Sequence, residues 1–170
     1  MLEIFDRLAP FFEDNYRRIN VREYARIMGI SPPTASKLLE QFHKEGLLDK
    51  EADRNYIFYH ANKESKEFID LSRTYWWKKL AKSGLIEHLE KELVTPTIIL
   101  FGSLAKAEVN SKSDIDIAVI SPTEKELTLK WFEKKLGRTI QIFQFRTRND
   151  AQSRELLNNI LNGYMVSGSW

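Results

Sequence analysis

The stretch FGSLAKAEVNSKSDIDIAVI, residues 101–120, decides how the C-terminal half of the chain is interpreted. The Gly-Ser pair at 102–103 follows the apolar run TIILF, which predicts a strand over 97–101 that ends in a glycine turn. Such a turn exposes backbone N–H groups, which suits a phosphate. Asp114 and Asp116 then open a second apolar run. Because two like charges on one strand face are costly unless a cation joins them, the stretch indicates a metal-phosphate site.

The composition sets broad limits on the class of protein. A chain of 170 residues holds one ordinary domain or two small ones. It contains no cysteine, which excludes disulfide frameworks and thiolate zinc sites. Acidic residues throughout the N-terminal stretch are wrong for a secretory signal, and no apolar run approaches membrane-spanning length, so we expect a cytoplasmic protein without membrane contact. The net charge is +2 and neither half is strongly basic, so nucleic-acid binding would need a local patch.

The N-terminal third predicts three helices and a hairpin. Residues 2–18 have helical spacing of apolar residues, with Pro10 expected to kink or split the helix. A short helix over 21–28 should end at Gly29. Ser31 is a good N-cap for the next helix, which should end at Gly46. The run LLDKEADRNYIFYHA then predicts two strands joined by a charged tip.

This order of elements resembles the winged helix-turn-helix domains of bacterial and archaeal transcriptional regulators, over roughly residues 15–62. The resemblance implies that the second helix enters the major groove of DNA and that the wing touches the backbone. The residues that would face DNA are Arg22, Pro33, Thr34, Ser36, Lys37, Gln41, Lys44 and the wing-tip Arg54, with Arg26 beside Arg22. Of these, Thr34, Lys37 and Gln41 suit base edges, and the basic residues suit phosphates.

A winged helix used only for protein contacts is the alternative. Glu40 and Glu45 lie on the same helix as the proposed DNA-contacting residues, and Glu51 and Asp53 lie in the wing, where they would repel DNA.

The rest of the chain predicts a long connecting helix and an alternation of strands and helices. Residues 62–94 are helical in pattern, with a break at Ser83-Gly84. The elements expected after Pro96 are strands over 97–101, 115–120 and 139–145 and helices over 103–108, 124–136 and 150–162. The predicted fold class is α+β, with a winged helix domain at 1–62, a connecting helix at 63–95 and a small α/β domain with a mixed sheet at 96–170. A long helix of this kind often pairs with its copy, so we also expect a homodimer.

The stretch FGSLAKAEVNSKSDIDIAV resembles the minimal nucleotidyltransferases of the polymerase beta superfamily, with a likeness that extends over residues 96–165. The resemblance implies that Asp114 and Asp116 hold two Mg²⁺ ions and that Gly102 and Ser103 cradle the phosphates of a nucleoside triphosphate. Two further roles follow from the likeness: Lys106 would neutralise phosphate charge, and Ser113 would orient the carboxylates. Relatives of this class act in toxin–antitoxin pairs, so a helical protein partner is also implied.

Active members of this superfamily carry a third carboxylate on a later strand. Here the matching strand reads RTIQIFQF and offers Gln141, or Gln144 if the register slips. An amide cannot accept a proton at neutral pH, and Asp150 and Glu155 lie on the last helix, where they are not expected to replace it. Two hypotheses remain: an enzyme that transfers a nucleoside monophosphate to a hydroxyl group, and a transcriptional regulator whose degenerate transferase domain only binds a nucleotide or a partner.

Overall fold

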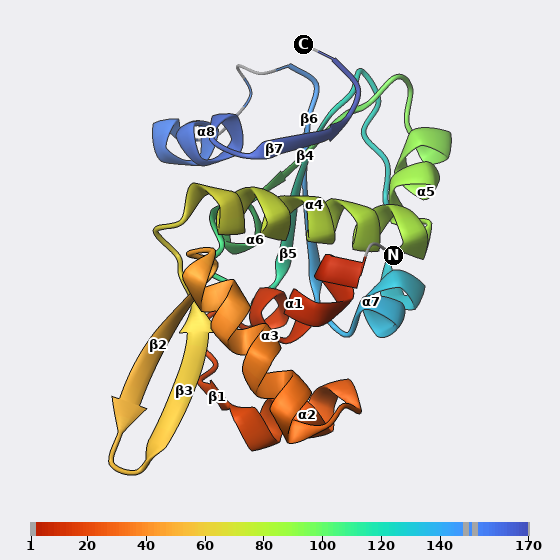
Figure 1. Cartoon of the computed structure of the whole chain (residues 1–170). Coiled ribbons are helices and arrows are strands. Elements are labelled where there is room, and N and C mark those ends of the chain that lie inside the picture. The colour runs from red at the N-terminus through yellow and green to blue at the C-terminus, as the bar shows by residue number, and fades with distance from the viewer. Residues whose placement is uncertain (1–2, 148–149, 151–152, 170) are drawn as a thin grey trace. The chain divides into compact units, whose positions relative to one another are not determined.

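The computed structural model describes residues 3–147, 150 and 153–169, which divide into two units (Figure 1). Unit 1 holds the chain up to residue 71 together with residues 107–111. Unit 2 holds residues 72–106 and the chain from residue 112 onward. The division falls inside α4, Lys66–Ser83, so this helix contributes to both units.

Unit 1 combines helices with a small antiparallel sheet. Its sheet has the order β1-β3-β2, and β2 and β3 are joined by a two-residue loop, Arg54–Asn55. The elements are α1 Glu3–Glu13, β1 Ile19–Asn20, α2 Val21–Met28, α3 Pro32–Lys44, β2 Leu48–Asp53, β3 Tyr56–Ala61 and the start of α4.

The ends of α2 and α3 follow directly from their capping residues. The Asn20 side chain accepts a hydrogen bond from the backbone N–H of Glu23, and the Ser31 hydroxyl accepts one from the N–H of Thr34. Gly29 ends α2 in the left-handed conformation, with φ of 63°. The predicted borders of α2 and the predicted start of α3 are therefore confirmed, while α3 ends at Lys44, before the predicted Gly46. The buried residues that join the elements of unit 1 are Phe5, Leu8, Phe11, Phe12, Ile19, Tyr24, Ala35, Leu39, Phe42, Tyr59 and Phe68.

The first helix differs from its prediction. It runs as one helix through Pro10 and ends at Glu13, so the expected split and the extension to residue 18 are wrong, while residue 2 lies outside the described residues. Phe11 and Phe12 are fully buried, and this packing holds the helix together beyond the missing proline N–H. The Asn15 amide donates to the Phe11 carbonyl over 2.7 Å, which satisfies the helix end.

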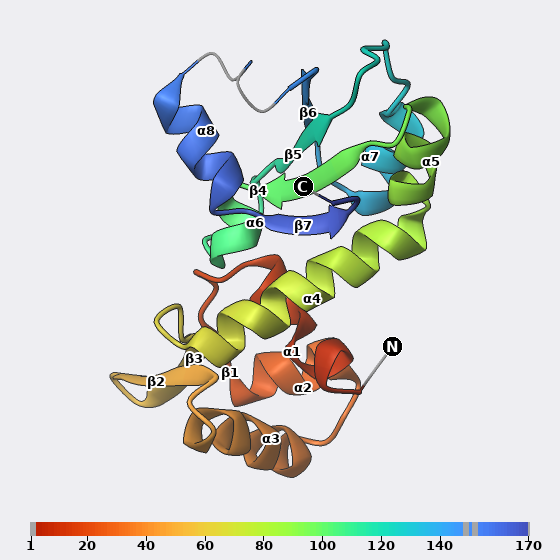
Figure 2. The same cartoon turned by 90° about the horizontal axis from the view of Figure 1, so that it is seen from above.

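Unit 2 is built on a mixed four-stranded sheet with the order β6-β5-β4-β7 (Figure 2). β6 runs parallel to β5, and the other pairs are antiparallel. The predicted α+β class with a mixed sheet is confirmed. The elements are the end of α4, α5 Leu85–Glu92, β4 Thr97–Phe101, α6 Ser103–Lys106, β5 Ile115–Ile120, α7 Lys130–Leu136, β6 Ile140–Phe145, α8 Arg154–Leu161 and β7 Tyr164–Ser167.

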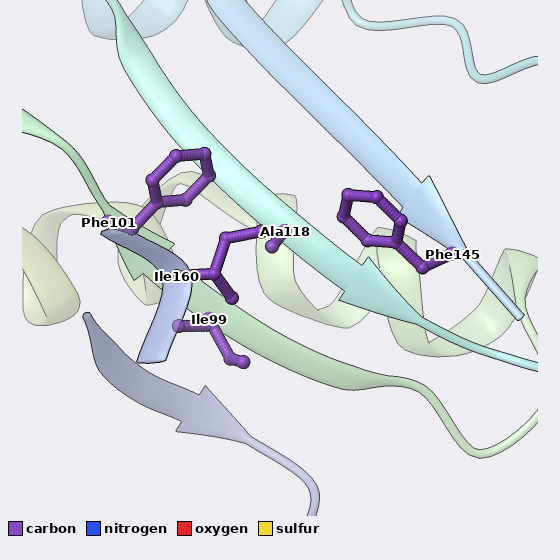
Figure 3. Packing of buried hydrophobic residues seen from close by; sticks show 5 residues of the cluster. All are labelled: Ile99, Phe101, Ala118, Phe145 and Ile160. Carbon is purple, nitrogen blue, oxygen red and sulfur yellow. The ribbon is translucent and has the colours of Figure 1, made fainter. Parts of the chain in front are cut away.

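One face of this sheet is covered by α8. The cluster on this face joins Ile160 of α8 to Ile99, Phe101, Ala118 and Phe145 of the strands (Figure 3). Because alternate residues of a strand share a face, Asp116 lies on the same face as Ala118, one step further toward the strand start. The apolar cluster therefore supports the segment that carries the acidic pair.

Two predicted helices of unit 2 are shorter than expected. The helix predicted over 124–136 begins only at Lys130, because the Gln144 side chain binds both the N–H and the carbonyl of Lys125, at 3.1 and 2.8 Å, and holds that segment along β6. The helix predicted over 103–108 ends at Lys106, since Ala107 is left-handed with φ of 54°. The helix predicted over 150–162 is described as α8 from Arg154 to Leu161; residues 151–152 lie outside the described part.

No strand was predicted over Tyr164–Ser167, where the structure has β7. Gly163 makes this strand accessible, because a Cβ atom there would lie 2.7 Å from the Leu100 carbonyl oxygen and 2.8 Å from that of Ile160. Only a residue without a side chain lets the chain leave α8 and pair at once with β4.

Candidate functional site

The Gly-Ser turn and the acidic pair meet at one end of the sheet of unit 2. Phe101, the last residue of β4, pairs with Asp116 on β5, so the turn that follows Phe101 lies beside the Asp116 side chain. Gly102 is left-handed, with φ of 69°, and a Cβ atom there would lie 2.2 Å from an Asp116 carboxylate oxygen. Glycine is required at this position because the carboxylate occupies the space that a side chain would fill.

The two carboxylates are separated by one residue and repel each other when both are ionised. Asp114 directly precedes β5 and Asp116 is its second residue; both are half-buried. Burial, and to a lesser extent the Asp114 charge, raises the pKa of Asp116 above its ordinary value. The ionised pair is therefore unfavourable by itself, and a cation between the carboxylates would offset both effects.

Gln141 stands beside this pair on the neighbouring parallel strand. It is in register with Asp116, and its Nε2 donates to an Asp114 carboxylate oxygen over 2.7 Å. The amide thus supplies a donor that the acidic pair needs, but it provides neither a negative charge nor a proton acceptor.

The structure decides between the two glutamines that the sequence left open. Gln144 pairs in register with Val119, three residues further along β5, and its amide is used by the backbone of Lys125. Gln141 is therefore the glutamine that lies beside the acidic pair, and Gln144 has a structural role.

The remaining predicted residues of the site lie in α6 and directly before Asp114. Ser103 begins α6 and is half-buried. Lys106 is exposed at the end of α6, where its Nζ donates to Asn159 of α8 over 3.1 Å. The Ser113 carbonyl accepts a hydrogen bond of 2.6 Å from Arg138. Asn159 and Arg138 were missed from the sequence, because neither lies in a recognisable motif.

The two downstream acids do not complete the site. The Asp150 carboxylate accepts hydrogen bonds from the N–H and hydroxyl of Thr147, at 2.7 and 2.9 Å, and the backbone bond lowers the pKa of Asp150 most strongly. Glu155 is exposed on the first turn of α8. Within the described part of the chain, no three acidic or histidine side chains gather as a metal site.

The donor set present nevertheless fits magnesium. Mg²⁺ prefers oxygen ligands and is commonly held by one or two carboxylates together with substrate phosphates and water. Asp114 and Asp116 supply the carboxylates, and Gly102 presents backbone without a side chain next to Asp116.

In unit 1, the residues predicted to face DNA are all exposed: Arg22, Pro33, Thr34, Ser36, Lys37, Gln41, Lys44 and Arg54. The acidic residues of this unit that would repel DNA form hydrogen bonds or ion pairs with neighbouring side chains. Lys50 and Tyr59 bind Glu40, at 2.8 and 3.1 Å, and lower its pKa, with the Lys50 hydrogen bond as the larger cause.

The remaining acids are also engaged. Arg18 pairs with both Glu51 and Asp53 of β2, at 3.1 and 3.3 Å. Gln41 donates to Glu45 over 2.8 Å, so a base contact by Gln41 requires this bond to be exchanged. The acidic groups therefore leave a weaker negative field on this face than their number indicates.

Comparison with known families bears on unit 2. Residues 84–166 match the family model described as "Polymerase beta, Nucleotidyltransferase", which supports a nucleotidyltransferase domain in this part of the chain. The match includes the Gly-Ser turn, the acidic pair and Gln141. No curated protein matches the chain. In the part of the chain that the structure describes, no helix combines the length and the apolar character needed to cross a bilayer.

Gly102→Ala is expected to weaken binding of ATP with Mg²⁺ at least about tenfold, because the new methyl group must displace the Asp116 carboxylate. Isothermal titration calorimetry measures the affinity. Gly137→Ala is the matched control: Gly137 has the same φ of 69°, but a Cβ there has no neighbour within 4 Å. Equal affinities for the two variants would show that backbone strain alone, and not the Asp116 contact, governs the effect.

Proposed function

We propose that unit 2 binds a nucleoside triphosphate with Mg²⁺ at the end of β4 and β5. Asp114 and Asp116 would be the metal ligands, and Gly102 and Ser103 would lie along the phosphates, with Lys106 and Ser113 at the margin. The observation that carries this proposal is the close approach of Asp116 to Gly102, where an added Cβ would lie 2.2 Å from a carboxylate oxygen, so that the turn and the acidic pair are neighbours.

The reaction that such a site would serve is nucleotidyl transfer. An acceptor hydroxyl oxygen forms a bond to the α-phosphorus, the bond from that phosphorus to the pyrophosphate oxygen breaks, and the hydroxyl proton must be taken up by a base. Bound Mg²⁺ would stabilise charge on the attacking and leaving oxygens. The carboxylates position the triphosphate, and the α8-covered sheet face keeps them fixed.

The proton is the weak point of this chemistry. Gln141 occupies the position beside Asp116, where an acidic residue would be the natural base, and its amide donates to Asp114 instead. The site therefore favours nucleotide binding over rapid transfer. This observation supports the second candidate function, in which the chain is a regulator and the bound nucleotide is a signal.

Unit 1 is proposed to bind DNA as a winged helix-turn-helix domain. Its support is the order of elements and the exposed side of α3, where Lys37 and Lys44 lie with Thr34. Arg54 at the hairpin tip would meet the backbone of the duplex. A homodimer would match a palindromic site, and a helical protein partner remains an alternative companion. Use of a nucleoside triphosphate fits the cytoplasmic location predicted from the sequence.

Gln141→Glu is expected to raise the rate of nucleotidyl transfer by about 100-fold, because the variant places a proton acceptor beside Asp116 without a change in side-chain length. The assay follows transfer of label from α-labelled ATP, GTP, CTP or UTP in the presence of Mg²⁺ and cell extract. The same variant should melt at a lower temperature without Mg²⁺ and recover when Mg²⁺ is added, since three carboxylates then meet.

The double variant Gln141→Glu with Asp114→Asn is the control and should lose the gain. A wild-type protein that transfers label as fast as Gln141→Glu would contradict the role given to Gln141. Binding of nucleotide without transfer by either protein would favour the regulator.

Lys37→Gln is expected to weaken binding to duplex DNA and to reduce the slope of log K against log salt by about 0.9, as loss of one phosphate contact requires. Fluorescence anisotropy over a range of salt concentrations measures both. Lys66→Gln, which removes the same charge from the exposed start of α4, should leave binding unchanged. Association that does not depend on salt would contradict a DNA-binding role for α3.

A further inference from the structure

The outer side of α7 carries an exposed tryptophan among lysines. Trp131 is 59% exposed, and Lys130, Lys134 and Lys135 are exposed beside it. Residues three and four apart on a helix are neighbours, so Trp131 shares one side of α7 with Lys134 and Lys135, and Lys130 lies next to Lys134. We call these four residues the α7 basic face.

The core of unit 2 does not need this tryptophan. The buried anchors of α7 are Phe132 and Leu136, and a Phe132 ring atom lies 3.9 Å from the Cβ position of Gly84. Trp131 makes a T-shaped contact with Phe132, with 4.9 Å between the ring centres. Most of the indole is left in water, which is an unfavourable place for a large aromatic surface.

The positions of the lysines on α7 are electrostatically unfavourable. Lys130 and Lys134 are like charges four residues apart, and Lys130 lies in the first turn of α7, where the helix dipole disfavours a cation. Glu133 is the only acid within Lys130–Leu136, and its carboxylate accepts a hydrogen bond of 3.0 Å from the Ile140 N–H. An anion bound outside the helix would relieve this repulsion.

One lysine is already fixed over the ring. Lys135 Nζ lies 4.6 Å from the centre of the Trp131 ring and donates to the Ser83 carbonyl over 2.9 Å. This second bond ties the ammonium group to the end of α4, so the indole and the cation are held as one unit. A flat ligand with negative charge at its edge complements this pairing.

We propose that the α7 basic face binds single-stranded nucleic acid, with a base stacked on Trp131 and phosphates beside Lys130 and Lys134. An aromatic ring next to positive charges is the arrangement by which single strands are bound without sequence preference. A duplex offers no free base face to the indole, and an acidic peptide would use the lysines but gain little from the ring. The inference does not depend on the proposed nucleotide site.

The α7 basic face is connected to the acidic pair through the residues that follow α7. Gly137 ends α7, and the next residue, Arg138, donates to the carbonyl of Ser113, which precedes Asp114. β6 with Gln141 follows at once. A nucleic-acid strand bound along α7 would therefore lead toward the acidic pair. Only this last step of the inference rests on the proposed function.

The test is fluorescence anisotropy of the full chain with a labelled single-stranded oligothymidylate, without nucleotide or Mg²⁺. Trp131→Ala is expected to weaken binding by about fivefold or more, and Trp131→Phe should retain most of it, since stacking survives. The double variant Lys130→Gln with Lys134→Gln should weaken binding and lower its salt dependence by about 1.4 in slope. Circular dichroism checks that each variant is folded.

Arg154→Gln, which removes an exposed charge from α8, is the matched control and should not change oligothymidylate binding. Wild-type affinity in both Trp131→Ala and the double lysine variant would overturn the proposal. A second result would also overturn the proposal: the wild-type chain binds labelled polyglutamate but not oligothymidylate, and the double lysine variant no longer binds polyglutamate. The α7 basic face would then bind an acidic peptide.

Discussion

The contact between the Asp116 carboxylate and the bare backbone of Gly102 is the constraint on which the site depends. It requires β4 and β5 to pair in one register, with Phe101 opposite Asp116, and it requires a left-handed glycine at the strand end. The same register sets Asp116 beside Gln141 and leaves Ala118 in the apolar cluster under α8. A shift of the strand register by one residue would turn the carboxylate to the other face of the sheet. The packing of the cluster and the geometry of the site therefore depend on the same register.

An amide at position 141 is compatible with the proposed binding of a nucleotide but does not supply the base that nucleotidyl transfer needs. A carboxylate there would add a third negative charge to a pair whose burial already raises the pKa of Asp116. The amide adds no third charge and donates to Asp114, but it supplies no base. If unit 2 binds a triphosphate without transferring it, as proposed, the nucleotide would act as a signal, and a DNA-binding unit on the same chain would give that signal an output.

Much of this could be predicted from the sequence, for local reasons. The glycine turn, the acidic pair and the caps at Ser31 and Gly29 are short motifs with one favoured conformation each. The elements that were missed depend on distant contacts: β7 exists because Gly163 fits against Leu100 and Ile160, and residues near Lys125 are not helical because Gln144 binds them. The role of Gln141 needed the strand register, which periodicity does not supply.

The central claim is that a divalent ion and a triphosphate together make the acidic pair favourable. Isothermal titration calorimetry of the wild-type chain with ATP, with and without Mg²⁺, tests it most directly. The account predicts saturable binding of ATP in Mg²⁺ at millimolar concentration or below, and far weaker binding when Mg²⁺ is absent or Asp116 is replaced by Asn. The absence of any heat of binding for Mg²⁺, ATP or the other nucleoside triphosphates at millimolar concentration would contradict it.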